Sequence, residues 1–403
     1  MNLRQLSGIV LLVGFAPTIA VAASSPQFPQ VEASQYPYSL EMEARSGELV
    51  RLDYEVISPY DDAVLYIPIE VEVGSDGRQY VLDQGDENIK VFGPDNEYLF
   101  AFGGKGQAPG EWQRTTLFTL SPDKNVYVWD DRHQAFHVFT ADGEYLHRVR
   151  HEGGRLEVQS VAWISPMELV VSGLSLAFEY NGFVAHRFRI KREGDQFTLE
   201  KTASFIETRK TAPGLYSLLE SGFLSRDLDG NLLFSATRRH EIAKYDLEGE
   251  LMWRISDPTI MPDAATLLEA TESGRVRIPR GTGRSAGTVS TEDWIINTSV
   301  VEVAGLPARP PIPAGTTGYV DTAAGADRSS VKTRKVLELI DRRQPKERRL
   351  VVDTWEDFWL QTADHEGRTL YGFLSTHTNP VPIRGRLRVE EPRPEPQGDG
   401  RRS

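Results

Sequence analysis

The apolar residues of this chain recur in short runs separated by turn residues, and the whole pattern repeats. Residues 76–99, 123–146 and 229–252 can be laid over one another without a gap. The first two segments share 10 of 24 positions, and all three begin with Asp and carry a late Glu. A repeat with a period of about 40 to 50 residues indicates an array of similar structural units. The pattern therefore predicts an architecture, whereas no comparable pattern predicts a reaction.

Each segment contains two short strand-like runs. Residues 80–82 and 127–129 are rich in β-forming side chains, and residues 89–92 and 136–139 alternate apolar with polar positions. Alternation of this kind predicts a strand with one buried face. The turn that follows can supply the left-handed residue of a tight hairpin; it reads Asp95-Asn96, Asp142-Gly143 and Glu248-Gly249 in the three segments.

Further apolar runs flank these pairs. Residues 65–73 and 117–120 precede the first two segments, and Tyr98-Leu99 and Tyr145-Leu146 open another strand at their ends. Each unit then has four antiparallel strands, which is the composition of a propeller blade.

These residues resemble the NHL-type repeat of six-bladed β-propellers, in particular secreted bacterial ones. The resemblance is carried by strands that end in Asp (YVLD, YVWD), strands that close on Phe (IKVF, FHVF), the acid-glycine turn, and a Gly-rich connector at 102–112. It covers residues 65–146 well and 223–255 less closely, because Ala236 replaces the Asp of the other two segments. It implies an all-β, six-bladed β-propeller of four-stranded, NHL-like blades.

The remaining blades are inferred from weaker patterns. Residues 158–204 predict an irregular blade, 293–340 a second, and 349–374 a third. Residues 48–57 are the candidate for an N-terminal strand that closes the ring, which would remove exposed sheet edges. We expect the propeller to span 36–390, with an insertion at about 258–317 that contains a short helix at 264–273. The charged, Pro-rich tail at 391–403 is expected to be disordered.

Residues 1–23 have the pattern of a signal peptide. Arg4 is followed by an apolar run at 9–16, and Ala20-Val21-Ala22 precedes Ala23 as a small-residue cleavage site. We therefore expect an exported protein, periplasmic or extracellular, with no membrane span in the mature chain. The chain has no cysteine, so disulfides, thiolate metal sites and a bacterial lipid anchor are excluded.

Composition narrows the expected partners. The chain has 403 residues and a net charge of −13, which argues against nucleic acid because phosphate binding relies on clustered Lys and Arg. The same charge disfavours adhesion to anionic lipid. We expect a monomer that binds a protein, peptide or glycan.

Because the strands of a blade are antiparallel, the connector between its second and third strands lies on the same face as the connector to the next blade. Several polar loops therefore share one face, at the mouth of the propeller channel. That face would present a set of charged and polar side chains as a site for a polar or anionic ligand; the candidates are Asp86, Arg132, His133, Arg238, Arg239 and His240. The alternative is that these are ordinary solvated loops. Trp112 is the candidate for an exposed aromatic platform that stacks on carbohydrate, although packing between blades explains most tryptophans of this chain.

Asp83 and Asp130 occupy equivalent strand ends. They could ligate an axial metal, but carboxylates without a supporting ligand at fixed spacing are a weak metal signal. The favoured role is structural, with each carboxylate accepting backbone N–H groups and fastening the following loop. We therefore expect no metal and no cofactor.

Motifs for catalysis are not found. The Gly103-Gly104-Lys105-Gly106 run lacks the Ser or Thr of a phosphate-binding loop, and no Gly-x-Ser-x-Gly elbow occurs. The leading hypothesis is a non-catalytic exported propeller that binds its partner on the channel-mouth face. One alternative is a lactonase-like hydrolase or lyase with a channel-mouth metal and an acid or base from Asp86, His133 or His240. Another is a purely structural role in an exported assembly.

Overall fold

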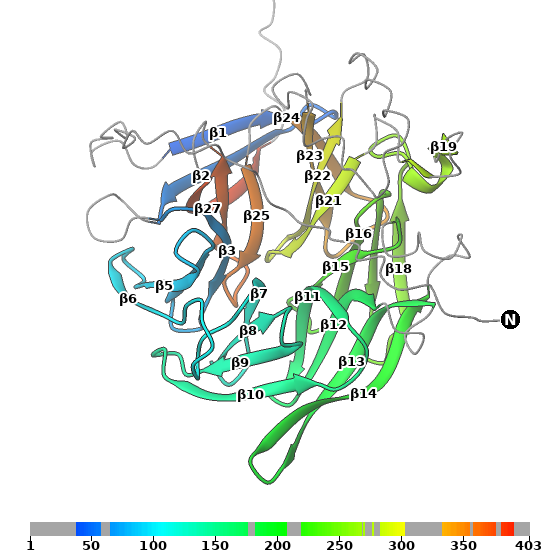
Figure 1. The fold of residues 1–403 in the computed structure, drawn as a ribbon. Coiled ribbons are helices and arrows are strands. Elements are labelled where there is room, and N and C mark those ends of the chain that lie inside the picture. Colours follow the sequence, from blue (N-terminus) through cyan, green and yellow to red (C-terminus); the bar gives the residue numbers. More distant parts are fainter. Residues whose placement is uncertain are drawn as a thin grey trace, which may run out of the picture.

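The computed structural model describes residues 38–57, 65–175, 182–207, 219–267, 269–270, 276–277, 283–302, 333–354, 358–375 and 380–390. These residues form an almost entirely β structure whose sheets are arranged around a common centre (Figure 1). The predicted signal peptide and the C-terminal tail lie outside the described residues.

The first two blades follow the strand order that the repeat predicts. Each is an antiparallel meander whose strands pair in sequence order. Blade 1 contains β3 (Pro68–Val73), β4 (Gln79–Asp83), β5 (Asn88–Phe92) and β6 (Tyr98–Phe102), and blade 2 contains β7 (Thr115–Leu120), β8 (Val126–Asp130), β9 (Ala135–Phe139) and β10 (Tyr145–His151). The turn residues predicted to be left-handed have positive φ, at 66° for Asn96, 82° for Gly143 and 93° for Gly249.

One expectation about these strands is wrong. The strands β5 and β9 were expected to bury one face only, yet β9 is buried at every position and β5 at all but its first. Each blade packs between two neighbouring blades, so both faces of its middle strands are covered. Lys90 and His137 are therefore buried inside the fold rather than exposed on it.

Blade 3 lies where the sequence predicts an irregular blade. It consists of β11 (Leu156–Ser165), β12 (Glu168–Ser175), β13 (Phe183–Glu193) and β14 (Gln196–Glu207). The last two strands form a long hairpin that projects from the body (Figure 1). Near its tip β14 pairs in parallel with β10, at Val149 with Phe197, and so joins blades 2 and 3 into one continuous sheet.

The strands of blade 4 lie where the third repeat predicts them, and the strands of blade 5 show that the predicted insertion is partly wrong. Blade 4 contains β15 (Gly222–Arg226), β16 (Leu232–Ala236), β17 (Glu241–Tyr245) and β18 (Leu251–Ser256), and blade 5 contains β21 (Gly283–Ser290), β22 (Trp294–Glu302), β23 (Thr333–Asp341) and β24 (Arg349–Thr354). The strands β21 and β22 fall within the predicted insertion at 258–317, so much of that segment belongs to a blade. Between the two blades lie a short 3-10 helix, η3 (Ala264–Leu267), and the two-residue strands β19 (Glu269–Ala270) and β20 (Val276–Arg277).

The last blade closes the ring with strands from both ends of the described chain. Its order is β25 (Phe358–Ala363), β26 (Leu370–Ser375), β27 (Pro380–Glu390), β2 (Leu49–Val56) and β1 (Tyr38–Glu43). The pairing of β2 with β27 confirms the closing strand predicted at 48–57. The segment at 349–374, expected to form one blade, is instead divided, because β24 is the outer strand of blade 5 and β25 the inner strand of blade 6.

The inner strands of the six sheet units form a closed circuit. The strand β3 contacts β7, β7 contacts β11, and the contacts continue through β15, β21 and β25 back to β3. Apolar clusters fill the spaces between blades; one joins Tyr80 and Val91 of blade 1 to Phe118 and Phe139 of blade 2. The fold is therefore an all-β propeller, and its six sheet units agree with the predicted number of blades.

Candidate functional site

A polar channel runs along the centre of the propeller. It has a volume of about 750 Å³ and is lined by residues of all six inner strands, β3, β7, β11, β15, β21 and β25. Hydroxyl and amide side chains form about half of the polar part of the wall, beside charged and titratable ones; the hydroxyl and amide residues are Ser75, Thr119, Ser121, Gln159, Ser160, Ser225, Thr288, Ser290, Gln361 and Thr362. The wall is therefore suited to hydrogen bonding rather than to holding an apolar molecule.

Two carboxyl groups of β3 line this channel. Glu70 and Glu72 lie two residues apart on one strand and so on the same face of it. Burial raises the pKa of Glu72 to about 7, although a hydrogen bond from Thr362 opposes the shift. Burial, together with the nearby Glu72 carboxylate, raises the pKa of Glu70 well above its usual range, against a hydrogen bond from the Phe118 N–H. Paired carboxyl groups with raised pKa values inside a cavity mark a candidate functional site.

Several polar side chains of the channel wall are occupied in joining the blades. The Glu70 carboxylate accepts the N–H of Phe118 in β7 at 2.7 Å, and Ser160 accepts the N–H of Leu224 in β15 at 2.6 Å. Gln361 of β25 similarly bridges to the backbone of β3. Such contacts satisfy the free backbone groups of the inner strands. Among the residues that the structure describes, Glu72 has a hydrogen bond with Thr362 and none with the backbone of a neighbouring blade, so it is the carboxyl group best placed for a ligand.

The predicted polar loops separate into exposed and buried groups. Arg132 and His133 lie exposed in the turn between β8 and β9, and Asp86 is exposed in the equivalent turn of blade 1. Arg238 is half-buried. These positions are compatible with the predicted channel-mouth face, but the channel itself is lined by other residues.

Arg239 and His240 are not presented to solvent, which corrects the prediction. Arg239 is buried and pairs with Glu220 at 2.9 Å and Glu241 at 3.0 Å. His240 is buried as well, with its Nε2 2.6 Å from Glu338 of blade 5 and its Nδ1 accepting the N–H of Asp257. His240 therefore links blade 4 to blade 5, whereas Arg239 is paired within blade 4.

Trp112 is also buried, so it offers no platform for stacking on a sugar. Only 1% of its surface is exposed, and its ring meets Phe139 edge-on in the cluster between blades 1 and 2. The connector before it must pass very close to this ring. A Cβ on Gly103, where φ is +74°, would lie 2.1 Å from the indole. The Gly-rich connector therefore serves the packing of Trp112.

Asp83 and Asp130 have matching surroundings. Asp83 accepts the N–H groups of Tyr66, Ile67 and Gly85. Asp130 accepts those of Gln113, Arg132 and His133, in addition to a longer contact from Arg114. Each carboxylate thus joins the connector that enters its blade to the turn after the strand that the Asp ends. These contacts fit a structural role for both residues.

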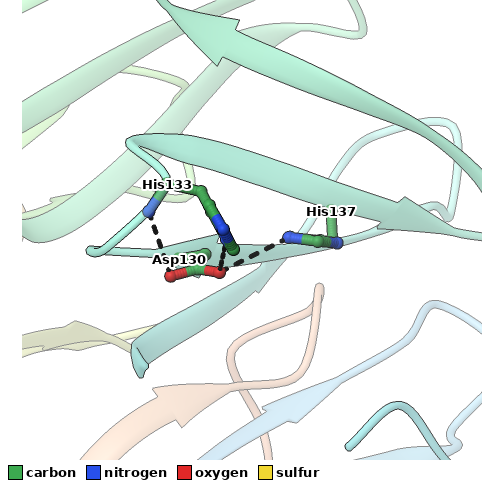
Figure 2. A group of neighbouring side chains, drawn as sticks. All are labelled: Asp130, His133 and His137. Carbon is green, nitrogen blue, oxygen red and sulfur yellow. Dashed lines mark hydrogen bonds and ion pairs between the residues drawn. The ribbon is translucent and has the colours of Figure 1, made fainter. Parts of the chain in front are cut away.

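Asp130 also gathers two histidines (Figure 2). His133 Nδ1 lies 2.6 Å from its Oδ2, and His137 Nε2 lies 3.6 Å from the same oxygen. Burial raises the pKa of Asp130, but the nearby His137 ring, the backbone N–H groups and the His133 ring lower it by more, so the net pKa is lowered and the carboxylate stays charged. The three side chains have ligand atoms within 4.8 Å of one another.

Three important residues were missed from sequence. Glu70 and Glu72 lie in a run, PIEVEV, that was assigned to a strand, and the alternation of Glu with apolar residues signalled that one face is polar. What the pattern could not show is that this face lines a closed channel. His137 was interpreted as the exposed position of an alternating strand, so its contact with Asp130 was not foreseen.

Known proteins resemble this chain in fold. No protein-family model matches it, and no curated protein matches it. A solved structure of a protein from Bacteroides fragilis NCTC 9343, described as exported, is similar over 85% of this chain and 96% of that chain, with 9% identity and a TM-score of 0.52. A DUF4221 member from Bacteroides vulgatus (7% identity, 88% and 97% coverage, TM-score 0.48) and virginiamycin B lyase from Staphylococcus aureus (10%, 83% and 99%, 0.44) are also similar. At these identities the likeness shows the fold alone.

No helix among the described residues is long and apolar enough to cross a membrane.

Proposed function

We propose that this chain is an exported β-propeller of the NHL type that binds a small polar ligand, the end of a peptide or a glycan, in its central channel without changing it chemically. The observation that carries the proposal is the placement of Glu72 in the channel wall beside Glu70, with a pKa raised to about 7. The charged form of a carboxyl group that is partly desolvated in a cavity is stabilised by a partner that donates hydrogen bonds or carries positive charge.

The dimensions of the channel support a ligand of limited size. Sites for small molecules have volumes of roughly 300 to 1,000 Å³, and the channel has about 750 Å³. Its hydroxyl groups would complement the hydroxyls of a sugar or the amides of a peptide, while Glu72 would accept from a hydroxyl or an amine. The proposal includes export directed by the N-terminal signal peptide and a mature chain that is a monomer.

The test measures binding to a stated set of probes. Oligosaccharides and short peptides with a free amino terminus would be titrated calorimetrically against the wild-type chain and against Glu72→Gln. We expect a probe that binds the wild type and binds the variant at least ten-fold more weakly. The control is Glu144→Gln, which changes an exposed glutamate of an outer turn. Equal affinity of all three proteins for every probe that binds would overturn the assignment of the site.

A second candidate is a hydrolase or lyase that uses the same channel. The specific support is that a carboxyl group with a pKa near 7 is suited to general acid or base catalysis at neutral pH. Turnover of lactone or ester substrates, with a pH profile that breaks near 7 and loses this break in Glu72→Gln, would favour the enzyme. Binding of a probe that is recovered unchanged would favour the binding protein.

A further inference from the structure

Blades 1 and 2 carry different side chains at three equivalent positions. The repeat aligns Asp83 with Asp130, Asp86 with His133, and Lys90 with His137. In both blades the first residue ends the second strand, the second residue lies in the turn, and the third lies in the third strand. The two sets can therefore be compared directly.

In blade 1 the buried carboxylate is paired with a cation from the same blade. The Lys90 ammonium lies 2.9 Å from Asp83 and 2.5 Å from Asp86. Lys90 is itself buried, with 5% of its surface exposed. One positive charge thus sits between the two carboxylates, as a buried charge requires.

Blade 2 keeps the carboxylate but has lost the lysine. His133 and His137, which align with Asp86 and Lys90 of blade 1, converge on Asp130 Oδ2 (Figure 2). His137 is 0% exposed, and among the described residues neither of its ring nitrogens has a hydrogen-bond partner. A buried imidazole that bonds to nothing is costly, since its polar atoms have given up water without replacement.

The third repeat shows what happens when the acid is absent. Blade 4 has Ala236 in place of the aspartate and Ala243 in place of the lysine or histidine. Both alanines are fully buried. The residue of the third strand is therefore polar in the two blades that bury a carboxylate and apolar in the one that does not.

We propose that Asp130, His133 and His137 bind a divalent first-row transition metal ion, with Zn²⁺ as the best match. The ligands would be Asp130 Oδ2, His133 Nδ1 and His137 Nε2. One carboxylate oxygen and two imidazole nitrogens are ligands that suit this class of ion, whereas Ca²⁺ and Mg²⁺ prefer oxygen alone. His133 is one-third exposed, so the remaining coordination positions face solvent and would be filled by water.

The ion would do in blade 2 what Lys90 does in blade 1. It would neutralise Asp130, whose backbone hydrogen bonds hold the connector at Gln113 to the turn at Arg132. It would also give His137 Nε2 a partner. The site lies within one blade, and none of its three ligands lines the central channel, so it is independent of the proposed ligand site.

The experiment uses the full chain, purified without chelator or metal-affinity resin and then dialysed to remove loosely held ions. Titration with Zn²⁺ should give one equivalent bound. Titration with Co²⁺ should give visible absorption bands in the position and strength of a nitrogen- and oxygen-ligated ion. Zn²⁺ should also raise the midpoint of thermal unfolding.

Two variants test the ligands. His133→Ala changes an exposed turn residue and should fold, while binding Zn²⁺ at least ~100-fold more weakly. The double variant His133→Asp with His137→Lys copies the ion pair of blade 1. It should bind no Zn²⁺, show no Co²⁺ bands, and unfold at a midpoint that does not depend on metal. His365→Ala removes an exposed histidine of blade 6 and serves as the control, with affinity unchanged.

Two results would overturn the proposal. The first is a wild-type chain that takes up neither Zn²⁺ nor Co²⁺ at one equivalent, which would mean that the two histidines serve only to surround the Asp130 carboxylate. The second is equal affinity in wild type and His133→Ala, which would place the ion elsewhere. If the double variant does not fold, His133→Ala and His133→Gln still decide between these outcomes.

Discussion

The side chain of Gln361 in β25 pairs with the backbone on either side of Glu70 in β3. Its Oε1 accepts the Val71 N–H at 2.8 Å, and its Nε2 donates to the Ile69 carbonyl, also at 2.8 Å. The strands β25 and β3 are separated by about 290 residues along the chain, so this amide joins inner strands of blades 6 and 1 that come from distant parts of the sequence. It also holds in place the strand segment that carries the channel carboxylates.

We expect Gln361→Ala to lower the free energy of unfolding by about 1–3 kcal/mol, because it leaves a backbone N–H and a carbonyl of β3 without partners. Urea denaturation measures the change. Gln344→Ala, at an exposed position of the turn between β23 and β24, should change the stability by less than about 0.5 kcal/mol. Equal effects of the two substitutions would show that the bridge does not secure the ring.

The stability of the protein should depend on pH through Glu72. Its pKa is about 7 in the folded chain and about 4.5 in the unfolded chain. Between these values the folded state holds a proton that the unfolded state has released, so stability falls as pH rises from about 4.5 to 7 and then levels off. The side chain of Glu72→Gln is neutral in both states, so this variant does not lose stability through that position as the pH rises. We expect it to gain about 1–2 kcal/mol over wild type between pH 5 and pH 8, allowing for solvent screening in the channel.

Urea denaturation at pH 5 and pH 8 compares the two proteins. Glu144→Gln, on an exposed turn, should follow the wild type at both values of pH. If the difference between wild type and Glu72→Gln does not change with pH, the carboxyl group is not desolvated in the channel, and the proposed ligand site loses its main support.

The elements that could be predicted from sequence are those in which local pattern and burial agree. Blades 1 and 2 and the closing strand β2 have apolar runs bounded by turn residues, and they were found where expected. The strand β21 was missed because its sequence, GRSAGTVS, has little apolar content. Its buried Ser285 is instead held by Ser235 and Asn297 at 2.5 and 2.9 Å. A strand stabilised by buried hydroxyl and amide groups has no hydrophobic alternation to reveal it.

The candidate site was harder to predict because its partners are distant in sequence. Arg239 and His240 were interpreted as exposed loop residues, since nothing in their neighbourhood signals burial. His240 pairs with Glu338, 98 residues away, and a single sequence does not show that pairing. Likewise, the polar face of β3 could be recognised from its alternation, but its position on a closed channel follows only from the ring.

Trp112 should contribute to stability rather than to ligand binding. Trp112→Ala would open a cavity between blades 1 and 2, and we expect a loss of about 3–5 kcal/mol in the free energy of unfolding. Leu99→Ala, which truncates a side chain that is 41% exposed, should cost less than about 1 kcal/mol. A Trp112→Phe variant should bind every probe that the wild type binds. A selective loss of glycan binding in Trp112→Phe, with stability retained, would contradict the buried placement.

The pair formed by His240 and Glu338 should be a strong link between blades 4 and 5. Glu338 is fully buried, and its Oε2 lies 2.6 Å from His240 Nε2, while Arg349 reaches its Oε1 at 3.4 Å. His240→Ala would leave this carboxylate with only the longer contact and would deprive the Asp257 N–H of its acceptor. Removing one member of a buried pair costs about 3–5 kcal/mol, and urea denaturation should show a loss of this size. The double variant His240→Leu with Glu338→Leu should recover much of it, because no unpaired charge remains, whereas His365→Ala should have little effect. A double variant that is less stable than His240→Ala would show that the pair stabilises the seam beyond the cost of burying its charges.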